Sequence, residues 1–201
     1  KCNCRCPYCF VEKKNEVMDW EIARKAIELL INSKGRKKLL TLYGGEPLLV
    51  FPLVKKCIIF AKKFARLKGK KITISVVTNM TLLGPSHLSF LKKTSTHLIV
   101  SLVGRKEDHD KFRKFIDGKG SFDAAYSKIP LIWKYCPPET TGVCFCIFPD
   151  TISRLEKNFE YLLNLGFRNF NLEFILHFKR WREKCLVHFL KAFKKIIQHW
   201  E

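Results

Sequence analysis

Four cysteines crowd into the first nine residues of this 201-residue chain: Cys2, Cys4, Cys6 and Cys9. Disulfides between such close neighbours would be strained, so the group is better interpreted as thiolate metal ligands in a reducing compartment. The spacing Cys2-x3-Cys6-x2-Cys9 places three thiolates on one tight loop. Three ligands on an iron–sulfur cubane leave one iron open to a substrate or cofactor, whereas a four-cysteine electron-transfer site leaves none.

A zinc site built from all four cysteines is the competing interpretation. Four ligands within eight residues form a cramped loop, and zinc sites usually take their second pair of ligands from elsewhere in the chain. We therefore predict that Cys2, Cys6 and Cys9 bind the metal and that Cys4 is a small buried side chain. A zinc-stabilised basic binding module stays open as the alternative.

The rest of the chain alternates between two kinds of segment. Helical apolar patterns occupy 19–33, 50–68, 84–94, 121–135, 151–165 and 182–200. Strand-like runs lie between them at 38–43, 71–77, 97–103, 141–147 and 168–175. Strands that alternate with helices predict βαβ units and a parallel sheet, so the fold class is α/β. A sixth strand is expected before Cys2, where the sequence begins.

The alternation within the strands places polar side chains together. Cys144 and Cys146 share one face of their strand, and Asn171 and Glu173 share one face of the next. Because helices should cover the apolar face of such a sheet, we expect the polar face to line a lumen or cleft. Glu173 is therefore our candidate catalytic residue. The alternative is a structural ion pair of Glu173 with a lysine or arginine at the rim, such as Arg168 or Arg180.

Several motifs together resemble the radical S-adenosylmethionine (SAM) superfamily, and within it the anaerobic sulfatase-maturase and SPASM-type peptide-modifying branch. The cysteine loop has an aromatic residue, Tyr8, before its last cysteine. The other motifs follow in the order of that branch: Gly44-Gly45-Glu46-Pro47, Thr78-Asn79, Ser101-Leu102-Val103-Gly104, and the stretch from His109-Asp110 through Arg113 to Gly120-Ser121-Phe122. The resemblance extends from Cys2 to about Phe174.

This resemblance implies a fold, two cofactors and a site. The fold is a partial (β/α)6 TIM-like barrel that lacks its first strand, formed by one core domain over residues 1–201 that is truncated at the N-terminus and at the C-terminus. The cofactors are a [4Fe–4S] cluster on Cys2, Cys6 and Cys9 and a SAM molecule. The residues expected to contact SAM are Tyr8, Gly44, Gly45, Glu46, Pro47, Thr78, Asn79 and Ser101.

The implied reaction is reductive cleavage of SAM to a 5′-deoxyadenosyl radical, which abstracts a hydrogen atom from a peptide or protein side chain. A reductant protein such as flavodoxin or ferredoxin would supply the electron, and the protein would be cytoplasmic. A degenerate family member that binds SAM poorly and serves as a scaffold is a further alternative.

The chain departs from the branch in three places. Ser101-Leu102-Val103-Gly104 lacks the acid of the usual Ser-x-Asp-Gly. Cys144 stands near the position where relatives often carry an arginine, and a thiol cannot bind a carboxylate as arginine does. The cysteine-rich SPASM extension is also missing, because the remaining cysteines do not form its motif and are expected to be mostly buried thiols: Cys136, Cys144, Cys146 and Cys185.

Lysine and arginine number 38 against 18 acidic residues, which gives a net charge of +20. Such an excess is compatible with nucleic acid or an acidic peptide as partner. The lysines are spread over most of the predicted helices, and no nucleic-acid-binding motif accompanies them, so solvated helix faces are the favoured explanation. No apolar run is long enough to span a membrane.

Overall fold

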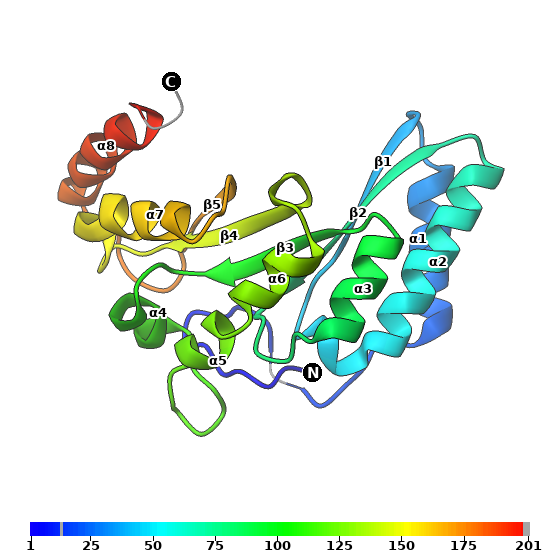
Figure 1. Cartoon of the computed structure of the whole chain (residues 1–201), viewed down its shortest axis with the longest axis horizontal. Coiled ribbons are helices and arrows are strands. Elements are labelled where there is room, and N and C mark those ends of the chain that lie inside the picture. The colour runs from blue at the N-terminus through cyan, green and yellow to red at the C-terminus, as the bar shows by residue number, and fades with distance from the viewer. Residues whose placement is uncertain (13, 199–201) are drawn as a thin grey trace.

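The computed structural model describes residues 1–12 and 14–198, in which five parallel strands form one sheet in sequential order. The sheet curls into a half-barrel, with β1 at one edge and β5 at the other (Figure 1). This confirms the predicted partial barrel of parallel strands. The strands are β1 (Lys37–Leu42), β2 (Lys71–Thr78), β3 (His97–Leu102), β4 (Thr141–Ile147) and β5 (Asn169–Phe174).

Helices connect the strands and cover the outer face of the sheet, as parallel pairing requires. They are α1 (Trp20–Asn32), α2 (Phe51–Leu67), α3 (Pro85–Lys93), α4 (Lys106–Phe112), α5 (Phe122–Tyr126), α6 (Ile129–Tyr135), α7 (Leu155–Asn164) and α8 (Glu183–Gln198). Short 3₁₀ turns occupy Pro47–Val50, Pro138–Thr140 and Ile152–Arg154. None of the helices within the described residues is long and apolar enough to cross a membrane.

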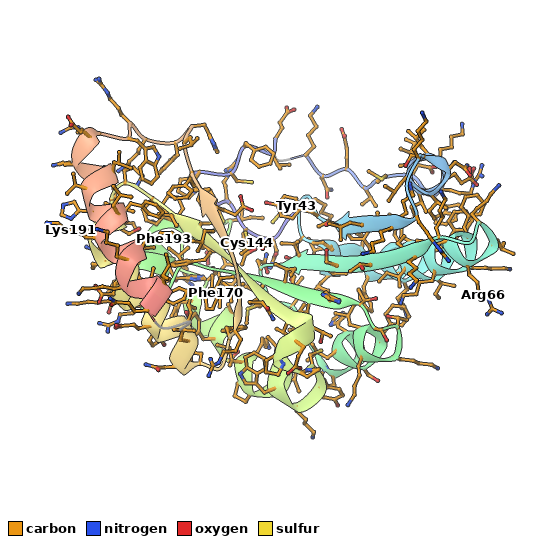
Figure 2. All side chains as sticks on the ribbon, turned by 90° about the horizontal axis from the view of Figure 1, so that it is seen from above. Tyr43, Arg66, Cys144, Phe170, Lys191 and Phe193 are labelled. Atoms are coloured by element: carbon orange, nitrogen blue, oxygen red, sulfur yellow. The ribbon has the colours of Figure 1, made fainter. Side chains whose placement is uncertain are left out.

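The two faces of the sheet differ in character because side chains alternate along each strand. Toward the helices, the strands contribute apolar side chains to the core, such as Val76, Val100 and Val143, all fully buried. Phe170 of β5 packs against this core. Cys144 of the neighbouring strand β4 lies on the opposite, inner face of the sheet, as Figure 2 shows. The inner face is therefore available for a site.

All five predicted strands are present, with ends that differ by at most one residue, but the helical predictions need two corrections. The predicted helix 121–135 is two helices, α5 and α6, because Pro130 stands in the first turn of α6 and favours a new start. Helix α4 was not predicted, since its sequence KEDHDKF has no apolar periodicity. The predicted helix 182–200 is observed as α8, Glu183–Gln198, and positions 199 and 200 of the prediction lie outside the described residues.

Candidate functional site

A cleft of about 570 Å³ opens at the C-terminal ends of the strands, on the inner face of the half-barrel. The segment that precedes α1 passes under these strand ends (Figure 1). The cleft brings together all predicted site residues except one: Cys2, Cys6, Cys9, Tyr8, Gly44, Gly45, Glu46, Thr78, Asn79, Ser101 and Glu173. The exception is Pro47, which is buried at the start of a 3₁₀ turn and lines a neighbouring cavity on the α1 side.

The cysteine loop is tied to the ends of β1 and β2. The Glu46 amide donates to the Lys1 carbonyl at 2.9 Å. Asn3 accepts from Asn79 Nδ2 at 2.9 Å and donates to Thr81 Oγ1 at 2.8 Å. Asn79 Oδ1 in turn accepts from the amide and the hydroxyl of Thr81. The predicted SAM contact Asn79 thus uses its side chain to hold the cysteine loop.

A second anchor joins the same loop to the segment after α4. The Arg5 amide donates to the Lys114 carbonyl at 2.8 Å, and Cys4 forms an antiparallel bridge with Phe115. The Cys9 amide donates to the Cys6 carbonyl at 3.1 Å, which closes the turn that carries the last two predicted ligands. The loop is therefore fixed at both sides of the cleft.

The thiols of Cys2, Cys6 and Cys9 are partly exposed and face the cleft, so their donor set suits an iron–sulfur cluster. Among the described residues no three Cys, His, Asp or Glu side chains lie close enough together to hold a single metal ion. A cubane spreads its ligands further apart than one ion does, because each thiolate binds a different iron. The three residues fit a cluster, and the zinc interpretation gains no support from this geometry.

Cys4 is only 3% exposed and accepts a hydrogen bond from Asn79 Nδ2 at 3.3 Å. Hydrogen bonds to the sulfurs of Cys2 and Cys6, and then burial, raise its pKa far above the usual range. A metal ligand must lose its proton, which this environment opposes. These contacts agree with the prediction of a small buried side chain.

Two glycines shape the corner that follows β1, each for its own reason. Gly44 has φ +141°, a conformation that favours glycine. At Gly45 an added Cβ would stand 1.9 Å from the carbonyl oxygen of Lys1. Gly45 was expected to let the backbone approach a ligand. The neighbour that it accommodates in this structure is the backbone that leads into Cys2.

Glu46 is 2% exposed and already accepts three protein hydrogen bonds. Its Oε1 accepts from Thr78 Oγ1 at 2.6 Å and from the Leu48 amide at 3.1 Å, and its Oε2 accepts from the Asn79 amide at 2.8 Å. Burial raises the pKa of this carboxyl group in spite of the three donors. Since each carboxylate oxygen has two lone pairs, Oε2 keeps one for a further donor in the cleft.

Polar side chains from three strands lie in a row on the inner face. Ser101 of β3 is the register partner of Cys144 of β4, and Cys144 is the register partner of Asn171 of β5. Two residues further along these strands, Cys146 is the register partner of Glu173. All five line the cleft, so the predicted convergence of the polar strand faces is confirmed.

Glu173 points into the cleft and its side chain is exposed there. Glu173 forms no ion pair with any of the described residues. Arg168 donates hydrogen bonds to the carbonyls of Leu163 and Phe167 instead. The structural alternative, a rim ion pair, is therefore not observed. A catalytic role for Glu173 stays a prediction.

Arg113 is a central residue of the cleft that our sequence-based site omitted. It is 8% exposed and its Nη1 donates to the hydroxyl of Tyr8. Burial alone would lower its pKa, but the electrostatic effects of Tyr8, Cys6 and Cys146 outweigh burial and raise it. The signal was present in the sequence, since Arg113 belongs to a motif that supported the family resemblance.

The rest of that motif holds Arg113 in place. His109, fully buried, contacts Ser121 Oγ at 3.1 Å, and Ser121 Oγ donates to the Arg113 carbonyl. Since the Ser121 proton is used on that carbonyl, His109 donates through Nε2, which leaves its Nδ1 without a partner. Gly120 packs against the Asp110 carboxylate, where a Cβ would stand 2.0 Å from Cγ. These residues fold the loop and do not line the cleft.

A hydrogen-bonded chain links Arg113 to a thiol on β4. Tyr8 accepts from Arg113 and lies 3.7 Å from Cys146 Sγ, to which it can donate. Cys144 stands two residues earlier on the same face of β4. The neighbouring Cys144 thiol, and then the charge of Arg113 and the Tyr8 hydroxyl, lower the pKa of Cys146 to about 7 against the opposing effect of burial. The same pairing, with burial, raises the pKa of Cys144, which therefore keeps its proton.

Cys136, Cys146 and Cys185 are buried, as expected, whereas Cys144 is half-buried and reaches the cleft. The expectation that these cysteines are mostly buried thiols therefore holds for three of the four. The strand alternation predicted that Cys144 and Cys146 share the polar face, and both of them line the cleft.

Comparison with known proteins agrees with the geometry. Residues 1–162 match the family model described as the Radical SAM superfamily. A serine-type anaerobic sulfatase-maturating enzyme of Bacteroides thetaiotaomicron is 35% identical over 144 residues, which cover 67% of this chain and 34% of the relative. A cysteine-type anaerobic sulfatase-maturating enzyme of Clostridium novyi is 26% identical over 176 residues, which cover 83% of this chain and 46% of the relative. The chain thus spans about a third to a half of the length of these relatives.

The fold is similar to that of native anSMEcpe, solved with bound AdoMet and Kp18Cys peptide. The TM-score is 0.83 at 23% identity, and the similarity covers 98% of this chain and 57% of that chain. Both the expected fold and the expected branch of relatives are confirmed.

Proposed function

The chain belongs to the radical SAM superfamily, and on this basis we propose that it cleaves SAM reductively at a [4Fe–4S] cluster held by Cys2, Cys6 and Cys9. The radical so formed would then modify a peptide or protein side chain. Members of this superfamily use a [4Fe–4S] cluster and SAM as cofactors. When bound, the cluster supplies the electron that breaks the S–C5′ bond of SAM and yields a 5′-deoxyadenosyl radical.

One observation carries this proposal: three cysteines on one anchored loop face the same cleft as the buried carboxylate of Glu46 and the polar ends of the strands. A three-cysteine loop supplies one ligand too few for a cubane, so one iron is left for SAM. A carboxylate beside that position is a suitable acceptor for the SAM ammonium group.

The remaining residues have supporting roles. Thr78 and the Asn79 amide orient the Glu46 carboxylate, and the Asn79 side chain holds the cysteine loop. Ser101 is buried and lines the cleft, and it is the candidate contact of the SAM carboxylate or ribose. Tyr8 lies beside Cys146, and Arg113 donates to its hydroxyl.

The substrate and the electron donor are inferred from the relatives and the chemistry. Sulfatase-maturating enzymes are named for action on a protein, and one structural neighbour is solved with a peptide. We infer a peptide or protein substrate, with Glu173 as the candidate acid or base at the open side of the cleft. An external one-electron donor of the flavodoxin or ferredoxin class would reduce the cluster.

The metal can be tested without a substrate. Anaerobically reconstituted protein should contain about four irons and four sulfides. Replacement of Cys2, Cys6 or Cys9 by alanine should abolish this content, and Cys4→Ala, the matched control on the same loop, should retain it. Loss of the metal in Cys4→Ala alone, or zinc as the only bound metal, would contradict the ligand assignment.

Cleavage is tested next. Reduced wild-type protein with SAM should release 5′-deoxyadenosine and methionine in equal amounts, measured by liquid chromatography and mass spectrometry. A protein that carries the cluster but releases neither product would be a scaffold rather than an enzyme.

A further inference from the structure

Two thiols in the cleft have no role in SAM binding or cleavage as described above. Cys144 and Cys146 stand two residues apart on β4, so both point to the inner face. Cys144 is half-buried and lines the cleft between Ser101 and Asn171, while Cys146 also lines the cleft but is only 5% exposed and lies beside Tyr8. Cys144, the more exposed of the two thiols, therefore meets the space in which a radical would form.

The surroundings assign different states to the two sulfurs. Cys146 can receive a hydrogen bond from Tyr8, whose hydroxyl is held by the buried guanidinium of Arg113. These groups stabilise a negative sulfur at Cys146. The neighbouring Cys146 sulfur, burial and the charge of Glu173 on β5 outweigh the opposing charge of Arg113 and raise the pKa of Cys144. Cys144 thus retains an S–H group at the surface of the cleft.

A thiol is a good donor of hydrogen atoms, because its S–H bond is weaker than an ordinary aliphatic C–H bond, such as those of the 5′-methyl group of deoxyadenosine. Hydroxyl groups, which have much stronger O–H bonds, are poor donors. Of the side chains in the row Ser101, Cys144 and Asn171, only Cys144 can therefore quench a carbon radical by giving up a hydrogen atom.

We propose, on the basis of the proposed function, that Cys144 donates a hydrogen atom to carbon radicals formed in the cleft. The S–H bond of Cys144 breaks, a C–H bond forms on the radical carbon, and a thiyl radical remains on the sulfur. One electron from the external donor that also reduces the cluster, together with one proton from solvent, restores the thiol. Each cycle thus uses two electrons and one proton, and the SAM leaves as methionine and 5′-deoxyadenosine.

This step determines the class of product. A substrate that loses a hydrogen atom to the 5′-deoxyadenosyl radical and regains one from Cys144 is neither oxidised nor reduced overall. Return of the atom to the opposite face of the carbon would invert its configuration. The substrate is therefore a peptide whose modified carbon keeps its C–H bond, in contrast to a substrate that is oxidised.

The inference can be tested without the peptide. Thiol hydrogens exchange with D₂O and carbon-bound hydrogens do not. Without substrate, the 5′-deoxyadenosyl radical is itself a carbon radical in the cleft. Wild-type protein, reduced by a thiol-free chemical reductant in D₂O, should therefore form 5′-deoxyadenosine that contains one deuterium, as measured by mass spectrometry.

The variants identify the donor. Cys144→Ser keeps the shape of the side chain and should lower the deuterium content to that of a reaction in H₂O, and Cys144→Ala should do the same. Cys136→Ala, which removes a buried thiol far from the cleft at the end of α6, should leave the deuterium content unchanged. Each variant is compared at equal iron and sulfide content.

A second measurement needs no loaded enzyme. In cluster-free protein, hydroxyl-radical footprinting should oxidise Cys144 at the rate of a cleft-exposed side chain, and Cys136 much more slowly, as measured by peptide mass spectrometry. This oxidation does not require a thiolate, so slow oxidation of both residues would overturn the inference, because Cys144 would then be out of reach.

The possible results separate the two proposals. If wild-type protein forms no 5′-deoxyadenosine, the proposed function fails. If it forms 5′-deoxyadenosine and methionine in equal amounts without deuterium, or if Cys144→Ser retains the deuterium, the proposed function stands and Cys144 is not the donor.

Discussion

A hydrogen bond of 2.6 Å between Thr78 Oγ1 and Glu46 Oε1 joins the end of β2 to the corner after β1. It fixes the one carboxylate that is buried beside the cysteine loop. Because Glu46 holds the ends of two strands and keeps one lone pair for the cleft, its removal should affect both stability and SAM binding.

We predict that Glu46→Gln lowers SAM affinity by about 1.5–3 kcal/mol, since a charge-assisted acceptor for the ammonium group is lost. Glu139→Gln, an exposed carboxylate at the opposite end of the sheet, is the matched control and should bind SAM normally. The measurement is calorimetric titration of reconstituted protein. Unchanged affinity in Glu46→Gln with an intact cluster would show that the Gly44–Pro47 segment is only a turn.

Gly45→Ala should weaken cluster binding, because its Cβ would overlap the Lys1 carbonyl and displace the segment that leads into Cys2. Gly84→Ala is the control, since neither Gly45 nor Gly84 has a positive φ and the Cβ added at Gly84 would meet nothing nearer than 3.7 Å. Iron content after reconstitution measures the effect. Equal iron content in the two variants would mean that the close contact at Gly45 is not needed for the loop.

The thiolate of Cys146 should be sensitive to Arg113. The thiolate is the reactive form, so in cluster-free protein alkylation of Cys146 by iodoacetamide should rise with pH and level off above its pKa of about 7. Arg113→Met removes a positive charge that lowers this pKa, so the midpoint should move to higher pH. Lys119→Met, at an exposed lysine, should leave the midpoint unchanged, provided that circular dichroism shows both variants folded. An unshifted midpoint in Arg113→Met would contradict the hydrogen-bonded chain through Tyr8.

His109 should make stability depend on pH near neutrality. Burial, and then the charge of Arg113, lower its pKa well below the ordinary 6.5, so the unfolded chain binds a proton first as pH falls. The stability is complete above pH 6.5 and should decrease below it, by at most about 1.4 kcal/mol per pH unit. Urea unfolding from pH 7.5 to 5 should show this slope in the wild type and in the exposed control His188→Gln, and a smaller slope in His109→Gln, where the lowered pKa of His87 still contributes. An undiminished slope in His109→Gln would place its origin elsewhere.

The sequence predicted the sheet and the location of the site because both depend on local patterns. Period-two alternation identified the inner faces of β4 and β5, and parallel strands must end at the same side, so Cys144, Asn171 and Glu173 could be placed in one cleft. The spacing of the cysteines indicated a cluster loop, and the corner at Gly44 and Gly45 was recognised through its resemblance to a motif of the family.

The sequence could not predict how polar groups pair across distant segments. Thr78 and Asn79 were expected to contact SAM, yet their side chains hold Glu46 and Asn3. Arg113 lies 105 residues from Tyr8 and reaches it only because the α4–α5 loop folds beneath the cysteine loop. Such contacts depend on tertiary packing, which no local pattern specifies.

The central claim is that three cysteines hold a [4Fe–4S] cluster with one iron open to SAM. The most direct test is the electron paramagnetic resonance spectrum of reduced, reconstituted protein, recorded with and without SAM. We predict the signal of a reduced [4Fe–4S] cluster, and a change in that signal when SAM is added, because SAM binds the open iron. A cluster signal that SAM leaves unchanged, or a protein that yields no cluster signal after reconstitution, would contradict the account.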